Sequence, residues 1–351
     1  MDMKQGRIID DEEIKSEMAS RRPYRKWLDE NLKPLKSLPK AKNPPPPTGG
    51  PLLLLQNLFG YSFEDLSIIM APMANHGQEP IGSMGVDVPL AVLSERPQLI
   101  YNYFKQLFAQ VTNPPLDAMR EELVTSLIST IGAQGNLFDE TPEHARHLKL
   151  EQPILTDDDL QKIRECGDEN LSSIIIDTVF RIDDGGKGIE EAMDKICAGA
   201  EDAVKGGKVI LILSDRRVNR EMAPIPALMA CSGVHHHLIS CGLRTRCSIV
   251  VDSGEPREVQ HFAALFGYGA DAVNPYLALE TMFTLKAQGV LNVDMKTARK
   301  NFIKAVNKGV LKVMSKMGIS TLQSYRGAQQ FEAVGLDEKL VEKYFSGTAS
   351  R

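Results

Sequence analysis

The sequence has few cysteines, and none of them has the close spacing of a metal-binding motif. Its five cysteines are Cys166, Cys197, Cys231, Cys241 and Cys247. An odd number of widely spaced cysteines favours free thiols in a reducing compartment over a disulfide framework. A metal site at Cys241 and Cys247 is disfavoured because Arg244 and Arg246 lie between them. We therefore expect no metal site.

Long apolar runs and an excess of positive charge are also missing. No apolar run approaches the roughly 20 residues that a membrane-spanning helix needs, and charged residues crowd the first 17 positions, where a secretory signal would be apolar. The net charge of −5 argues against a nucleic-acid partner, which requires clustered Lys and Arg. These absences predict a soluble protein of the cytoplasm or of a plastid, with no membrane or nucleic-acid partner.

The composition is that of a folded protein. Of the 351 residues, 42% are apolar and 25% are charged, which is the ordinary balance of a globular chain. This length is sufficient for one large domain or two domains of ordinary size.

Residues 1–38 form a charged segment that is followed by a linker at 39–50. The run IDDEEIKSEMASR predicts a short helix with an acidic first turn. Four consecutive prolines and two glycines then predict an extended, exposed connector.

Residues 51–137 show apolar positions at helical spacing, as in FEDLSIIMAPMA and RPQLIYNYFKQLFAQV. We expect this part to be mostly helical, with Ser62 and Ser94 as N-caps.

After Leu150 the pattern changes to short β-branched runs separated by helical stretches. The runs are SSIIIDTVF, GKVILILSD, TRCSIVVDSG and DAVNPY, with MGIST as a possible fifth strand. The alternation predicts an α/β fold in which βα repeats form a parallel sheet or an incomplete (β/α) barrel-like domain.

Several strands end in polar residues, where parallel α/β proteins bind their ligands. These are Asp177, Ser214, Asp215, Asp252, Ser253 and Asn274. The same residue types also cap helices and form turns, and we favour that role. The run His235, His236 and His237 is interpreted as packing and surface, because adjacent helical positions point in different directions.

Long runs of the sequence resemble, in the same order, the central domain of the glutamate synthase large chain. The runs that carry the resemblance include QGRIIDDEEIK, GSMGVDVPLAVLS, YFKQLFAQVTNPPLDAMREELV, ETPEHARHLKLEQPIL, EVQHFAALFGYGADAVNPYLALE and SKMGISTLQSYRGAQQFEAVGL. The resemblance implies that residues 1–38 join a preceding amidotransferase domain, that 51–295 are the central domain, and that 296–351 begin the flavin mononucleotide (FMN) barrel.

The resemblance also implies roles for two loops. In GSMGVDVP, it places Ser83, Met84 and Gly85 on the 2-oxoglutarate and FMN side of the substrate pocket. In VTNPP, it places Thr112 and Asn113 at the entrance of an ammonia tunnel, where they gate passage and make no bonds to the reacting atoms.

Near the end of the chain, the resemblance implies that Lys316, Gly318, Ser320 and Gln323 contact the edge of FMN. No catalytic residue is expected within this chain. Neither FMN nor the 3Fe-4S cluster of the complete enzyme has a complete site here.

The expected function is that of the connecting region of glutamate synthase, an oxidoreductase that converts glutamine, 2-oxoglutarate and a reductant into two glutamates. This region would hold the amidotransferase and FMN sites in register, and alone it should be inactive. Expected partners are the other domains of the same polypeptide and a small electron-donating subunit or ferredoxin. The alternative is a non-catalytic scaffold or interaction protein with the same fold.

Overall fold

The computed structural model describes residues 3–40, 49–80, 89–107, 116–117 and 119–351. Helices cover much of this part. The α-helices are α1 (Asp11–Ser20), α2 (Tyr24–Asn31), α3 (Gly50–Leu58), α4 (Ala71–His76), α5 (Glu121–Val124), α6 (Asp157–Arg164), α7 (Gly185–Lys205), α8 (Ala227–Ser240), α9 (Val259–Gly267), α10 (Tyr276–Ala287), α11 (Met295–Lys316), α12 (Leu322–Tyr325) and α13 (Glu338–Tyr344). A π-helical segment, Asp65–Met70, runs directly into α4. None of the helices in the described part is both long and apolar enough to cross a lipid bilayer.

A parallel sheet of four strands forms the centre of the fold. Its order is β10-β9-β7-β5, and all neighbours are parallel. The strands are β5 (Ser173–Asp177), β7 (Ile210–Ser214), β9 (Ser248–Asp252) and β10 (Ala272–Asn274). All four occur where the sequence predicts them, so the expected α/β fold with a parallel sheet is confirmed. In the described residues the sheet is open, and its strands follow one another in chain order.

The two faces of the sheet belong to two different apolar clusters. Leu211, Leu213 and Val251 pack with residues of α7, α8 and α9 in the larger cluster. Ile212 and Val250 instead pack with Leu and Ile side chains of α6 and of the strands β3 (Ser129–Ile131) and β4 (Leu148–Leu150). The crossover helices α7, α8 and α9 therefore lie on one face, and the other face is filled from the N-terminal half.

Three smaller sheets join segments that are distant in the sequence. Their strands are β1 (Lys33–Pro34), β3 (Ser129–Ile131) and β4 (Leu148–Leu150) in the first, β2 (Phe104–Gln106) and β11 (Phe331–Ala333) in the second, and β6 (Val179–Arg181) and β8 (Met222–Pro224) in the third. The β2–β11 pair ties the N-terminal half to the last part of the chain.

The helical expectation for residues 51–137 is correct only in part. Ser62 does cap a helix, because its Oγ accepts the Asp65 amide while the Asp65 carboxylate accepts the Ser62 amide. The run after Ser94 is not a helix: it forms a 3-10 turn at Ile100–Tyr103 and then β2. Pairing of β2 with β11, more than 200 residues later, outweighs the helical spacing. Ser94 caps only a short turn, accepting the amide of Arg96.

The expected strand at MGIST is also absent. Helix α11 continues to Lys316, and Gly318 at φ +67° turns the chain after it. Met314 at the end of α11 is fully buried, so packing favours the helix here. Only an isolated bridge between Ser126 and Thr321 has strand character.

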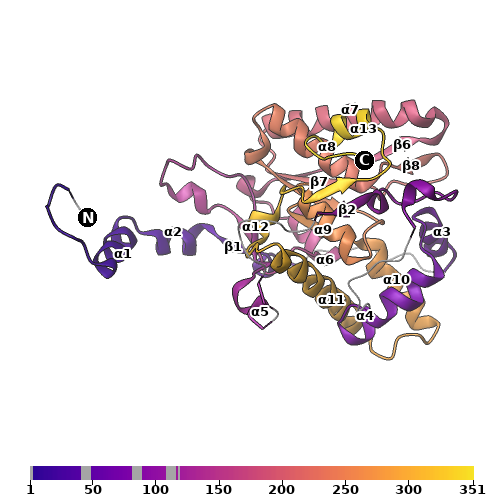
Figure 1. Ribbon diagram of the computed structural model, residues 1–351, viewed down its shortest axis with the longest axis horizontal. Helices are drawn as coiled ribbons and strands as arrows, with labels where there is room; N and C mark the ends of the chain where they lie inside the picture. Colours follow the sequence, from indigo (N-terminus) through magenta and orange to yellow (C-terminus); the bar gives the residue numbers. More distant parts are fainter. Residues whose placement is uncertain (1–2, 41–48, 81–88, 108–115, 118) are drawn as a thin grey trace.

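The N-terminal arm is the part of the chain that stands apart from this body (Figure 1). Every residue of α1 is exposed, and its Asp10 caps the first turn by accepting the amide of Glu12. The predicted charged helix is thus confirmed. Contact with the body begins at α2, which packs beside the 3-10 turn Pro142–Ala145.

Candidate functional site

The carboxyl ends of the parallel strands form a continuous row of polar side chains. In register across the sheet lie Asp177, Ser214, Asp252 and Asn274. This is where the sequence predicted polar residues to gather. The Asp177 carboxylate, at the edge of the row, forms an ion pair of 2.7 Å with the exposed Arg217.

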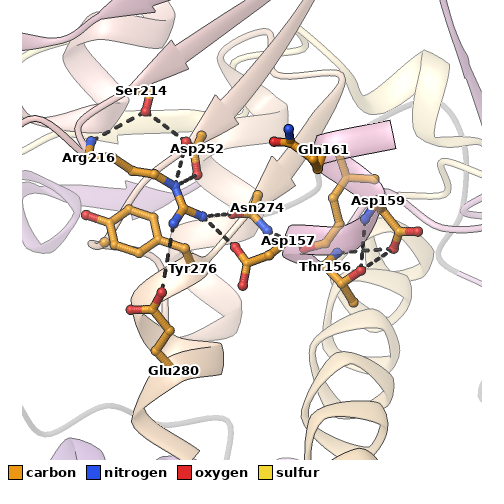
Figure 2. A network of polar contacts seen from close by, with 12 residues as sticks. Thr156, Asp157, Asp159, Gln161, Ser214, Arg216, Asp252, Asn274, Tyr276 and Glu280 are labelled. Carbon is orange, nitrogen blue, oxygen red and sulfur yellow. Dashed lines mark hydrogen bonds and ion pairs between the residues drawn. The ribbon is translucent and has the colours of Figure 1, made fainter. Parts of the chain in front are cut away.

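Arg216 lies at the centre of this row and connects most of it (Figure 2). Its Nε donates to both oxygens of Asp252 at 3.0 Å, and its Nη2 donates to Asn274 Oδ1 at 3.0 Å. The same Nη2 pairs with Asp157 at the start of α6. The guanidinium also lies 4.1 Å from the ring centre of Tyr276. One side chain therefore joins β7, β9, β10 and α6.

The sequence analysis missed Arg216, together with Asp157, Tyr276 and Glu280 around it. Its one available signal was position, since Arg216 follows a predicted strand end by two residues. The partners could not be identified, because they come from segments about 36 to 64 positions away that only the fold brings together.

Asp215 forms a second, fully buried cluster beside Arg216. Its carboxylate accepts hydrogen bonds from Ser253 Oγ at 2.5 Å, from the Tyr276 hydroxyl at 2.8 Å and from the Gly254 amide at 3.2 Å. Burial nevertheless raises the pKa of Asp215 to about 8, because removing a carboxylate from water costs more than these bonds return. Asp215 is therefore largely protonated close to neutral pH.

Two further buried acids surround the same edge. Burial raises the pKa of Glu255 to about 7, although it accepts the Ala227 amide at the start of α8. Burial likewise raises the pKa of Glu280 to about 7, with the Arg216 charge opposing the shift. Burial also raises the pKa of Asp252. The edge is thus crowded with acids around one arginine.

This arrangement is better suited to holding the fold together than to chemistry. The Arg216 side chain already contacts five other side chains, and Asp252, Asp215 and Glu255 are each at most 5% exposed. The capping and turn-forming role favoured for the strand-end residues agrees with these contacts. Ser253 and Asp215, for example, bond each other and the turn at Gly254.

A hollow of about 790 Å³ runs along α11 beside this network. Its lining combines basic residues of α11 with apolar side chains. Its lining includes Asp157, Leu279, Lys296, Arg299, Lys300, Ile303, Lys304, Lys308 and Leu311.

Of the residues assigned by resemblance, Ser83, Met84, Gly85, Thr112 and Asn113 lie outside the described residues. The flanks of their loops are described. Leu107 and Leu116 donate their amides to the carbonyls of Gln330 and Ser315, at 3.0 and 2.8 Å.

These two hydrogen bonds place Leu107 and Leu116 next to residues 315–336, the last run that carries the family resemblance. Glu79, just before the other loop, lies close enough to Lys312 of α11 for that charge to lower its pKa, although burial raises it more. A described flank of each of these two loops therefore lies near the carboxyl end of α11: Leu116 at the Ser315 carbonyl, and Glu79 near Lys312.

Gly318 and Ser320 lie on the turn between α11 and α12, with Lys316 as the last residue of α11 and Gln323 within α12. Lys316, Ser320 and Gln323 are exposed, and Gly318 is half-buried. The carboxyl end of a helix carries partial negative charge, so this turn does not suit the phosphate of FMN. The exposed side chains fit only contacts with the polar edge of a flavin that is held by other residues.

The histidine run is divided among three environments. His235 accepts a hydrogen bond from Arg244 Nε at 2.9 Å, His236 contacts Gln329, and His237 contacts Glu201 at 2.7 Å. All five cysteines are free thiols, and Cys241 is exposed.

Comparison with known proteins gives a family match over most of the chain. The model of the glutamate synthase central domain matches residues 55–337. The NADPH glutamate synthase large chain of Bacillus subtilis is 47% identical over 351 residues, which is 100% of this chain and 23% of the relative. The ferredoxin-dependent glutamate synthase 1 of Arabidopsis thaliana is 41% identical over 364 residues, covering 100% of this chain and 22% of the relative.

The NADH glutamate synthase of Schizosaccharomyces pombe is 45% identical over 370 residues, covering 100% of this chain and 17% of the relative. The chain thus spans 17% to 23% of the length of these relatives. Among solved structures, a mutant flavocytochrome b2 has a TM-score of 0.33 at 13% identity, covering 47% of this chain and 36% of that one. A mandelate oxidase has a TM-score of 0.32 at 14% identity, covering 50% and 42%. Neither score supports a shared fold.

Proposed function

The chain belongs to the glutamate synthase central domain family, and from this premise we propose that it works as the connecting region of a glutamate synthase large chain. The complete enzyme would use glutamine, 2-oxoglutarate and a reductant to form two glutamates. The observation that carries this proposal is the family match across residues 55–337, together with relatives at 40% to 47% identity over the whole chain.

In this proposal the domain keeps an amidotransferase site and an FMN site in register. Loops that carry Ser83, Met84 and Gly85, and Thr112 and Asn113, would line the 2-oxoglutarate pocket and the ammonia tunnel entrance. The Leu116 amide donates to the Ser315 carbonyl of α11, and Glu79 lies near Lys312 of the same helix, which supports this because one helix would then lie beside a flank of each loop.

Lys316, Gly318, Ser320 and Gln323 would contact the edge of FMN. When bound, FMN supplies the electrons that reduce the imine formed from 2-oxoglutarate and ammonia. The exposed side chains of this turn would orient the flavin edge, and other domains would hold its phosphate and the 3Fe-4S cluster. The division at 295/296 stays a prediction, and the family match extends across it.

The relatives' names include NADPH, NADH and ferredoxin-dependent enzymes. For this protein we propose the other domains of its own polypeptide as partners, a small electron-donating subunit or ferredoxin as the source of electrons, and the cytoplasm as its location.

The test measures coupling in the polypeptide that carries this chain. Asn113→Ala and Thr112→Val should raise the ratio of glutamine hydrolysed to glutamate formed, because ammonia escapes at a faulty entrance. Glutamate formation from added ammonia should stay close to that of the parent. Gln98→Ala, an exposed change in the same half, is the matched control and should leave the ratio unchanged. A native polypeptide of 38.8 kDa without activity would instead favour the scaffold alternative.

A further inference from the structure

Three side chains with metal-binding atoms meet where α7 packs against α8. Glu201 lies on α7, His237 on the last turn of α8, and Cys241 at the end of α8. Their ligand atoms all lie within 4.8 Å of one another. Since α8 leads from the carboxyl end of β7 to the amino end of β9, this cluster lies away from the Arg216 network.

The distances from the Cys241 sulfur to the other two ligand atoms match those between neighbouring ligand atoms in a tetrahedral metal site. Bonds of about 2.0–2.3 Å from a zinc ion to oxygen, nitrogen and sulfur place the ligand atoms about 3.4–3.6 Å apart. Cys241 Sγ lies 3.4 Å from Glu201 Oε2 and 3.7 Å from His237 Nε2. Only the contact between His237 Nε2 and Glu201 Oε2, at 2.7 Å, would have to widen.

We propose that Glu201, His237 and Cys241 bind a divalent cation of the zinc class, with water as the fourth ligand. The mixed set of oxygen, nitrogen and sulfur selects zinc-like ions over magnesium and calcium, which prefer oxygen. His237 and Cys241 have the i, i+4 spacing of a helical metal pair. The ion would link the end of α8 to α7, on the face of the sheet that α7, α8 and α9 cover.

The surroundings leave these three atoms available. Lys205 pairs with Oε1 of Glu201, so Oε2 remains for the metal. Cys241 is exposed, which gives an ion access from solvent.

Cobalt titration of the metal-free protein tests the site, because cobalt reports its ligands by absorption. The parent should show tetrahedral cobalt bands in the visible and a thiolate-to-cobalt band in the near ultraviolet. Cys241→Ser should lose the thiolate band and weaken cobalt binding more than about 100-fold. Cys241→His should keep binding and the visible bands but lose the thiolate band.

Cys166→Ser is the matched control, since Cys166 packs in the cluster on the other face of the sheet. It should leave both bands and the affinity unchanged. Equimolar zinc should also raise the melting temperature of the parent but not that of Cys241→Ser. A parent without a thiolate band, or a Cys241→Ser spectrum identical to that of the parent, would overturn the proposal.

Discussion

Among the residues at the carboxyl edge of the sheet, Arg216 is the one whose replacement we expect to lower the free energy of unfolding most. Replacing it with Met leaves Asp252, which is 3% exposed, without its cation. Breaking a fully buried ion pair costs about 3–5 kcal/mol. Because the Arg216 side chain is 36% exposed, we expect a smaller loss of about 2–3 kcal/mol in the free energy of unfolding, measured with urea.

Arg217→Met provides a control at the next position. Arg217 pairs with Asp177 at 2.7 Å, but its side chain is 74% exposed. Exposed ion pairs contribute at most about 1 kcal/mol. Equal losses for the two variants would contradict the central role of Arg216.

Asp215 should make stability depend on pH in a direction opposite to that of an ordinary carboxylate. Its pKa is about 8 in the folded state and near 3.8 when unfolded. Between these values the folded protein holds a proton that the unfolded chain has lost. The contribution of Asp215 to the free energy of unfolding is therefore fully present below about pH 4. It is lost as the pH rises from about 4 to about 8, by at most about 1.4 kcal/mol per pH unit.

Asp215→Asn should make that decline shallower, because an amide does not titrate. Urea unfolding of parent and variant between pH 5 and 8 measures the two slopes. Asp177→Asn makes the same chemical change at the half-buried end of β5 and is the matched control. An Asp215→Asn slope equal to that of the parent would show that Asp215 does not hold the proton.

At the level of elements, the fit between α11 and α9 depends on a glycine. A Cβ at Gly309 would lie 2.3 Å from Cγ2 of Val259 on α9. Gly309→Ala should therefore destabilise the protein by about 1–3 kcal/mol, although alanine favours a helix. Thermal or urea unfolding measures the change.

Two variants separate this contact from helix propensity. Gly199→Ala on α7 meets nothing within 4 Å, so it should stabilise by up to about 1 kcal/mol. The double variant Gly309→Ala with Val259→Ala should lose less stability than the sum of the two single changes, because the clash is relieved. Additive effects would refute the proposed contact.

The elements also show where the sequence was informative. Strands β7 and β9 were predictable because continuous apolar runs between glycines and polar ends are specific to buried strands. Strand β2 was not, since its partner β11 is more than 200 residues away and its own apolar spacing fits a helix. The same limit hid the Glu201 carboxylate, which lies 36 positions before His237. Contacts that only the fold creates leave no local signal.

At the scale of the whole molecule, residues 1–38 divide into two parts with different roles. All of α1 is exposed and projects from the body (Figure 1). By contrast, Leu35 and Leu38 pack against the apolar cluster under the sheet, and β1 pairs with β4. The charged segment is thus an exposed arm through the end of α1 at Ser20, whereas its last residues, from β1 onward, are part of the body.

Two deletions test this division. Removing residues 1–20 should leave the free energy of unfolding unchanged within about 0.5 kcal/mol, because none of the described side chains from 3 to 20 is buried. Removing 1–38 should destabilise by several kcal/mol, since two packed leucines and a strand are lost. Limited proteolysis of the parent should accordingly cut within 1–20 before it cuts the body. A large loss from the shorter deletion would mean that α1 packs against the body, and the arm could not then be a free connection to a preceding domain.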